Sequence, residues 1–219
     1  MNDAPIRSDT MMHSTPANRP AWIWLLPAVL LIPACYAWID RPLALFFHAR
    51  SDSGPVHLAQ MLTTLGAAGW WISGAALLYL VWRWLRPSRN RRAAGFVAVA
   101  VAVGAGLAEL LEKPLGRARP RLLFEDGSYG FAPLHFLPHY DSFPSSHAAG
   151  ALAAATAIAL VLPVRWRWQR IAVLTIGAGI AFTRVVITAH FLGDALAGGA
   201  MGCATVLACH WLAKRRGWL

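Results

Sequence analysis

The chain has 219 residues, of which 57% are hydrophobic and only 14% are charged. This composition is typical of a membrane protein and argues against a water-soluble domain with a solvated surface. The net charge of +10 would suit a nucleic-acid-binding protein, but the basic residues alternate with apolar segments and do not form one polar face. We therefore expect no nucleic-acid partner.

The N-terminal residues 1–20 are polar and contain prolines, so we predict a flexible cytoplasmic tail followed by a single domain over residues 21–219. A bilayer core about 30 Å thick takes about 20 apolar residues of helix. Six stretches meet that requirement, at residues 22–39, 69–85, 93–111, 146–162, 171–187 and 191–213. The 11 tryptophans fall near the ends of these stretches, as aromatic residues do at a membrane interface.

The fold class predicted from these stretches is therefore all-α, a polytopic membrane protein with six transmembrane helices. Between the first two, residues 40–68 have an amphipathic pattern that predicts an interfacial helix lying on the membrane. Basic residues follow the second, fourth and sixth stretches: Arg83, Arg86, Arg89, Arg91, Arg92, Arg165, Arg167, Arg170, Lys214, Arg215 and Arg216. By the positive-inside rule, both termini are cytoplasmic and the loops after the first, third and fifth stretches face outward.

The second outward loop, residues 113–145, is long and rich in glycine, proline and aromatic residues. It carries Lys113, Arg117, Arg119 and Arg121 on the side where the positive-inside rule does not predict basic residues. Long loops in compact proteins are often functional, and arginine forks match phosphate oxygens. The pattern predicts a catalytic outward loop; a basic cluster that only contacts anionic lipid is the alternative.

The sequence Pro-Ser-Ser-His at 144–147 precedes an alanine-rich run and predicts a helix N-terminus capped by Ser145 or Ser146. Free backbone N–H groups and the helix dipole make such a terminus a phosphate site. His147 would stand in the first turn, where it can give a proton to a leaving oxygen. The alternative is an ordinary serine-capped helix whose histidine faces water.

The sequence TRVVITAHFLGDA surrounds the third outward connection, with Arg184 at the end of the fifth span and His190 and Asp194 at the start of the sixth. If His190 and Asp194 are both helical, their i, i+4 spacing places them on one face. The carboxylate can then accept a hydrogen bond from one imidazole nitrogen and leave the other free as a nucleophile or base. The alternative is a pair of interfacial polar residues that water and headgroups satisfy.

The order RARP, PSSH and TRVVITAHFLGD resembles the three-part signature of the type 2 phosphatidic acid phosphatase superfamily. The third part has Thr183 where the family has serine, and the second has Ser146 where glycine is usual. The first part matches at Arg119 and Pro120. Its lysine is one residue out of register: Lys113 lies too close, and Glu112 occupies the strictly spaced position.

The resemblance implies that His190 attacks phosphorus to form a phosphohistidine, that Asp194 orients it, and that His147 protonates the departing oxygen. The implied phosphate-binding residues are Arg119, Arg184, Ser145, Ser146 and Lys113, with Arg117 or the shifted Lys113 supplying the charge of the first motif. Because arginines take the place of a cation, the resemblance implies neither metal nor cofactor.

The expected function is removal of a terminal phosphate from a lipid phosphate or pyrophosphate, at the outward face of a bacterial inner membrane. Undecaprenyl pyrophosphate, phosphatidylglycerol phosphate, phosphatidic acid and lipid A are the candidate substrates. Two alternatives stay open: a lipid phosphotransferase that uses the same site, and a non-catalytic phospholipid-binding membrane protein. The expected partners are the lipid substrate and the bilayer, and the sequence leaves the oligomeric state open.

Overall fold

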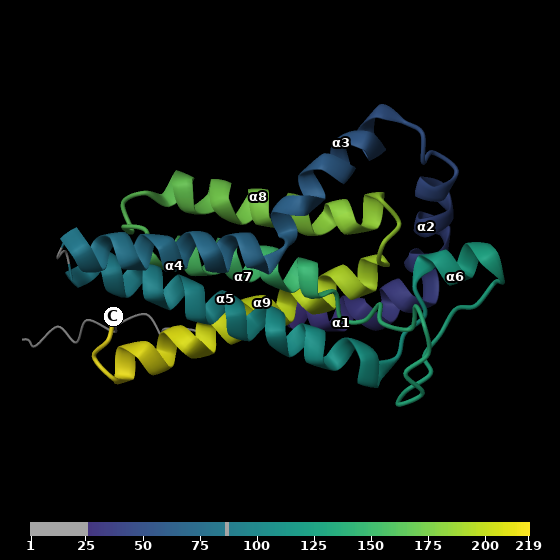
Figure 1. Ribbon diagram of the computed structural model, residues 1–219. Coiled ribbons are helices and arrows are strands. Elements are labelled where there is room, and N and C mark those ends of the chain that lie inside the picture. Colours follow the sequence, from purple (N-terminus) through teal and green to yellow (C-terminus); the bar gives the residue numbers. More distant parts are fainter. Residues whose placement is uncertain (1–25, 86–87) are drawn as a thin grey trace, which may run out of the picture.

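The computed structural model describes residues 26–85 and 88–219 (Figure 1). Its helices in chain order are α1 (Leu26–Ala34), α2 (Asp40–His48), α3 (Gly54–Thr63), α4 (Ala68–Leu85), α5 (Ser88–Leu115), α6 (Pro120–Glu125), α7 (Ser146–Val161), α8 (Arg167–Val186) and α9 (Leu192–Arg215). A π-helical stretch, η2 (Cys35–Ile39), joins α1 to α2, and a short 3₁₀ turn, η3 (Thr64–Gly66), follows α3. No β-strand occurs in these two ranges, so the predicted all-α class is confirmed.

Each of the six predicted spans coincides with a helix, but length and apolar composition do not support six crossings. Within the two described ranges, four helices are long and apolar enough to cross a membrane: Leu30–His48, Asn90–Leu115, Arg167–Val186 and Leu192–Arg215. The pair Gly54–Gly66 and Ala68–Leu85, bent by 46°, would supply a fifth crossing if it is counted as one span. The apolar helix α7 is shorter. The predicted tail, residues 1–20, and the start of the first span lie outside the described residues.

The first predicted helix does not end at residue 39 but continues through η2 into α2, and α3 is a separate helix. The interfacial position of residues 40–68 on the membrane stays a prediction. The sequence suggested a boundary because the charged pair Asp40 and Arg41 interrupts the apolar run. Asp40 is nevertheless buried, since its carboxylate is neutralised by Arg117, which lies far away in the sequence.

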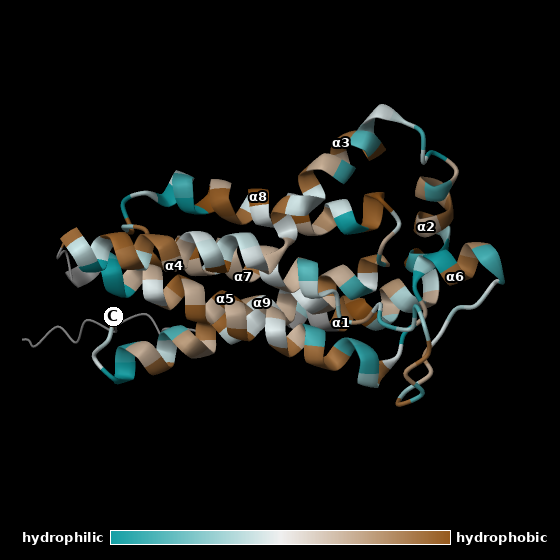
Figure 2. Cartoon of the chain, in the orientation of Figure 1, coloured by the Kyte–Doolittle hydropathy of each residue, from teal (hydrophilic) through white to brown (hydrophobic). Residues whose placement is uncertain are grey.

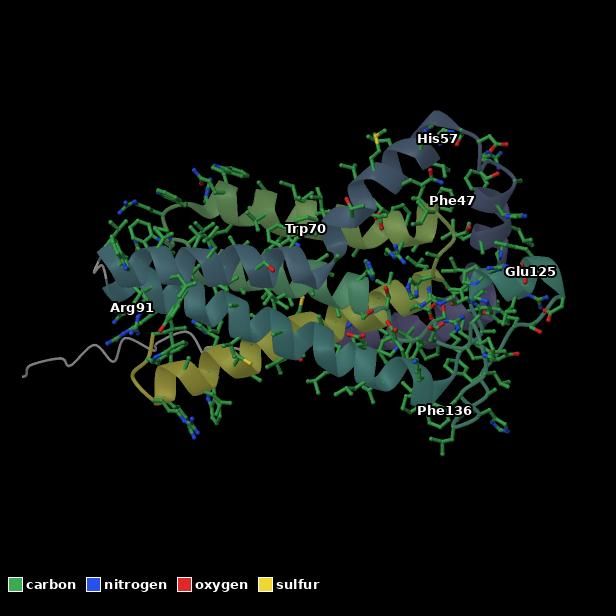
Figure 3. All side chains as sticks on the ribbon, viewed as in Figure 1. Phe47, His57, Trp70, Arg91, Glu125 and Phe136 are labelled. Carbon is green, nitrogen blue, oxygen red and sulfur yellow. The ribbon has the colours of Figure 1, made fainter. Side chains whose placement is uncertain are left out.

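The connections predicted to face outward gather at one end of the bundle. Figure 1 shows α2, α6, the loop after α6 and the turn between α8 and α9 at this end, with the loop between α7 and α8 and the C-terminus at the other. Hydrophilic residues gather towards both ends, and apolar residues dominate the helices between them (Figure 2). Arg91 and Glu125 mark the two opposite ends in Figure 3.

Helix α7 is the centre of the bundle and packs against α5, α8 and α9. Its side chains are mostly alanines, nine of its residues are buried, and small residues let helices in a membrane approach closely. On α9, a Cβ at Gly198 would lie 2.1 Å from the carbonyl oxygen of Ser145, and one at Gly202 would lie 2.3 Å from that of Ala149. Because glycine has no Cβ, α9 can approach the N-terminal turns of α7 closely at these two positions. Two of the three motifs meet at this contact.

Candidate active site

His190 lies in the turn between α8 and α9 and is almost fully buried, with 2% of its surface exposed. Its Nδ1 is 2.8 Å from the carbonyl oxygen of Ser142. Because a carbonyl can only accept, Nδ1 carries the proton, and the unprotonated nitrogen of the neutral ring is Nε2. Burial lowers the pKa of His190 well below 6.5, and the positive charges of Arg119 and Arg184 lower it further. The ring is therefore neutral at physiological pH, with Nε2 available as a nucleophile.

Asp194 does not contact His190 in the way the sequence predicted. His190 precedes α9, so the two residues do not share a helical face, and Nδ1 of His190 is 4.0 Å from Oδ2 of Asp194. Oδ2 instead accepts hydrogen bonds from the Ser142 hydroxyl at 2.6 Å and from the Phe191 backbone N–H at 2.8 Å. The predicted direct hydrogen bond is wrong, because a buried carboxylate at the third position of a helix is used to cap it.

A buried network of charges supports Asp194. Arg117 donates to Asp194 at 2.5 Å through Nη1 and to Asp40 at 2.7 Å through Nη2. The side chains of these three residues are at most 1% exposed. The second oxygen of Asp40 accepts the backbone N–H of Gly193 at 2.9 Å. One arginine thus ties the first membrane helix to the start of α9.

Arg117 is consequently a structural cation and does not supply the charge of the first motif to a phosphate. Although burial lowers its pKa, the carboxylates of Asp194 and Asp40 raise it, and the net direction is upward. Its guanidinium also lies 4.6 Å from the ring centre of Phe191 and 5.0 Å from that of Tyr36. The Arg117 side chain is buried and paired with two carboxylates, so it is not available to bind the phosphate of a substrate.

Arg119 and Arg184 lie close enough to His190 for both charges to lower its pKa. Arg119 lies just before α6, and Asp141 holds its guanidinium: Nε donates to the carboxylate at 2.6 Å and Nη2 to the carbonyl oxygen at 3.1 Å. Arg184, in the last turn of α8, donates through Nη1 to the Thr63 hydroxyl at 3.1 Å. Its buried Nε has no partner within the described part of the chain, so this arginine keeps donor capacity for an anion.

The N-terminus of α7 forms as predicted, with Ser145 as the N-cap. Its Oγ accepts the backbone N–H of Ala148 at 3.3 Å, and the residue is fully buried, so its hydroxyl is committed to the cap. Ser146 begins the helix, and its backbone N–H donates to Oε1 of Glu112 at 2.7 Å. His147 is half-buried in the first turn and stands near Arg119 and Arg184. The structure thus brings His147, His190 and both arginines into one site.

Lys113 is not part of this cluster. It is exposed in the last turn of α5 and makes no ion pair or hydrogen bond with any residue in the ranges 26–85 and 88–219. Glu112, one position earlier and about 100° around the helix, is the residue that points to α7. The residue that contacts the N-terminus of α7 is thus the one at the spacing of the lysine in the signature, and here it is a carboxylate.

Three residues of the site were not anticipated from the sequence. Asp40 had a usable signal, because an ionisable residue at the end of an apolar stretch is a functional candidate. Thr63 had none, since it is recognised only by the arginine it contacts. Ser142 also had none, because it acts through its backbone carbonyl as well as its hydroxyl.

Among the residues that the structure describes, no group of three or more histidine, cysteine, aspartate or glutamate side chains is arranged to hold a metal ion. The absence of a metal and a cofactor from the reaction stays a prediction. What the site offers chemically is a buried neutral imidazole, a second histidine at a helix N-terminus and two arginines. These groups can support transfer of a phosphoryl group to nitrogen.

Comparison with known proteins places these residues in a recognised context. The family model of the PAP2 superfamily matches residues 93–218. A lipid A 1-phosphatase of Rhizobium johnstonii is 32% identical over 157 residues, which cover 67% of this chain and 63% of that protein. A lipid A 1-phosphatase of Rhizobium etli is 31% identical over 156 residues, 66% of each chain. The chain thus spans slightly less than two thirds of the length of these curated relatives.

The fold is also similar to a solved structure. The crystal structure of a transmembrane PAP2 type phosphatidylglycerolphosphate phosphatase from Bacillus subtilis superposes with a TM-score of 0.64. The superposition covers 89% of this chain and 96% of that one, at 19% sequence identity. At this identity, the similarity concerns the arrangement of helices.

Proposed function

Because the chain belongs to the PAP2 superfamily, we propose that it is a metal-independent membrane phosphatase that removes phosphate from a lipid phosphate through a phosphohistidine at His190. The resemblance inferred from the three motifs is thereby confirmed at the level of the family. The observation that carries the proposal is the Nδ1–carbonyl hydrogen bond of a buried His190, which leaves Nε2 unprotonated beside two arginines.

In the proposed first step, Nε2 of His190 attacks phosphorus, and the bond between phosphorus and the lipid oxygen breaks. His147 gives its proton to that oxygen, and the dephosphorylated lipid leaves. In the second step, His147 takes a proton from water, the water oxygen attacks phosphorus, and the N–P bond breaks to release inorganic phosphate. Arg119 and Arg184 stabilise the charge on the phosphoryl oxygens in both transition states.

The substrate that we propose first is a lipid A 1-phosphate, since both curated relatives carry that name. Phosphatidylglycerol phosphate, phosphatidic acid and undecaprenyl pyrophosphate are the competing substrates. The decisive experiment is a panel of these lipids with purified protein in detergent and phosphate release as the readout, with His190→Ala and His147→Ala beside the wild type. Rates near wild type for either variant would falsify the assignment.

The phosphohistidine can be tested directly. Protein incubated briefly with ³²P-labelled substrate and quenched in alkali should retain label that is lost on mild acid treatment, as expected of a phosphorus–nitrogen bond. His190→Ala should retain none. A newly phosphorylated lipid in place of free phosphate would instead identify the phosphotransferase, and binding without turnover would identify the non-catalytic protein.

We propose a bacterial inner membrane as the location, with the site on the periplasmic or extracellular side. The support is the basic residues that follow the second, fourth and sixth predicted spans, because Arg91, the loop between α7 and α8 and the C-terminus lie at the end of the bundle opposite α6 and Glu125 (Figures 1 and 3). A green fluorescent protein fused after Leu219 should fluoresce if the C-terminus is cytoplasmic, and a periplasmic reporter fused there should be inactive. The reverse pattern would place the site in the cytoplasm.

A further inference from the structure

Glu112 stands where the PAP2 signature has a lysine, and it is buried. Only 8% of its surface is exposed, and Oε1 accepts the backbone N–H of Ser146 at 2.7 Å. This N–H belongs to the first turn of α7, which the sequence predicts as the phosphate-binding helix terminus. A carboxylate of the protein therefore already occupies part of the position that a phosphate would take.

The surroundings of Glu112 define the charge balance of the site. Its carboxylate interacts electrostatically with Arg119 and Arg184, and with the negative charge of Asp141, which pairs with Arg119. Two arginines and two carboxylates sum to a formal charge of zero, whereas a lysine at position 112 would bring the same four positions to +2. The departure from the family pattern thus removes two units of positive charge from the site.

We propose that Glu112 is a specificity-determining residue that weakens the binding of the phosphate group itself. A phosphate at the start of α7 has to displace the Glu112 carboxylate from Ser146 or bind beside a negative charge. In either case, a free or water-soluble phosphate binds poorly, and the apolar part of a lipid substrate has to supply the affinity. The same repulsion speeds the departure of inorganic phosphate after the second step. This inference rests on the proposed function for the identity of the ligand.

The test compares phosphate binding in three variants at position 112 with the wild type. Glu112→Gln removes the charge but keeps an oxygen that accepts the Ser146 N–H, so the cap survives. Glu112→Lys restores the family charge, and Glu112→Ala removes both charge and cap. The matched control is Glu109→Gln, which lies one turn earlier on α5 and is exposed. Binding of inorganic phosphate is measured by titration calorimetry in detergent, and folding is followed by thermal melting.

We expect Glu112→Gln to bind inorganic phosphate about tenfold more tightly than the wild type, since one unit of repulsion at close range is removed. Glu112→Lys should bind more tightly again, Glu112→Ala should gain affinity but melt at a lower temperature, and Glu109→Gln should match the wild type. The inference is overturned if Glu112→Gln is folded and binds phosphate no more tightly than the wild type. Glutamine retains the cap, so this variant decides the matter even if the lysine variant does not fold.

A second measurement addresses substrate selection. Hydrolysis of p-nitrophenyl phosphate, which has no lipid part, should rise relative to hydrolysis of the lipid phosphate by about tenfold in Glu112→Gln. An unchanged ratio would contradict the inference. Because the calorimetry does not need turnover, failure of the proposed function is distinguishable: the wild type would then hydrolyse no lipid phosphate, while the order of phosphate affinities would still be measured.

Discussion

The carbonyl oxygen of Ser142 accepts the Nδ1 proton of His190 at 2.8 Å, and the hydroxyl of the same serine donates to Asp194 at 2.6 Å. Asp194 therefore reaches the proposed nucleophile through the two polar groups of one intervening residue. The carboxylate fixes the position of Ser142, and the carbonyl of Ser142 fixes the tautomer of the imidazole. Because the contact is indirect, substitution of Ser142 and substitution of Asp194 should change catalysis by different amounts.

Replacing Ser142 by alanine should lower kcat about tenfold with little change in KM, because the carbonyl remains while its anchor to Asp194 is lost. Asp194→Asn should lower kcat further, since it disturbs Arg117 and the start of α9 as well. Steady-state kinetics with a lipid phosphate check both, and Ser128→Ala in the loop after α6 is the control. If Ser142→Ala raises KM and leaves kcat unchanged, the serine does not position His190.

The network of Asp40, Arg117 and Asp194 should dominate the stability of this end of the bundle. Arg117→Met leaves two buried carboxylates without a counter-ion, and removal of one partner from a buried pair typically costs about 3–5 kcal/mol. Thermal melting in detergent should show a large loss for Arg117→Met and a smaller one for Asp40→Asn. Arg121→Gln, which breaks the exposed pair with Glu125, should melt like the wild type. Equal melting temperatures for Arg117→Met and Arg121→Gln would contradict the role of the network.

Close packing of α9 on α7 predicts a sharp contrast between glycines. Gly202→Ala would place a methyl group 2.3 Å from a backbone oxygen of α7, and forced overpacking of this kind costs about 1–3 kcal/mol. Gly179→Ala in α8 meets nothing within 4 Å and should be neutral or stabilising, because alanine favours the helix. Melting temperature and phosphatase activity are compared for the two variants. Similar melting temperatures would mean that α9 can shift away from α7 without loss.

The low pKa of His190 predicts the direction of its pH dependence. Since the ring is neutral well below pH 6.5, its ¹³C-labelled NMR signal, identified by its loss in His190→Gln, should not titrate between neutral pH and 6.5. Arg119→Gln removes a positive neighbour and should raise the pKa. The unfolded chain takes up this proton near pH 6.5 and the folded chain only at lower pH, so stability should fall as the pH drops below 6.5. A midpoint at or above 6.5 in the wild type would contradict the burial of a neutral ring.

The sequence was sufficient for most of the helices and for placing His147, His190, Arg119 and Arg184 at one end of the bundle, because apolar length and motif order depend on local chemistry. The sequence could not predict how the polar groups are paired. The partners of Arg117 are Asp40 and Asp194, each 77 residues away, and the acceptor for His190 is a backbone carbonyl, which every residue possesses. The end of the first helix was misplaced for the same reason, since a charge looks exposed until its counter-ion is known.

Asp40 lies outside residues 93–218, the region that the family model matches. A fragment limited to that region would contain all three motifs and yet leave Arg117 with one carboxylate in place of two. The helix that carries Asp40 is thus part of the support of the site, although it lies outside the matched region. Through Arg117 and the backbone N–H of Gly193, its carboxylate joins two of the three motif-bearing segments from a third part of the chain.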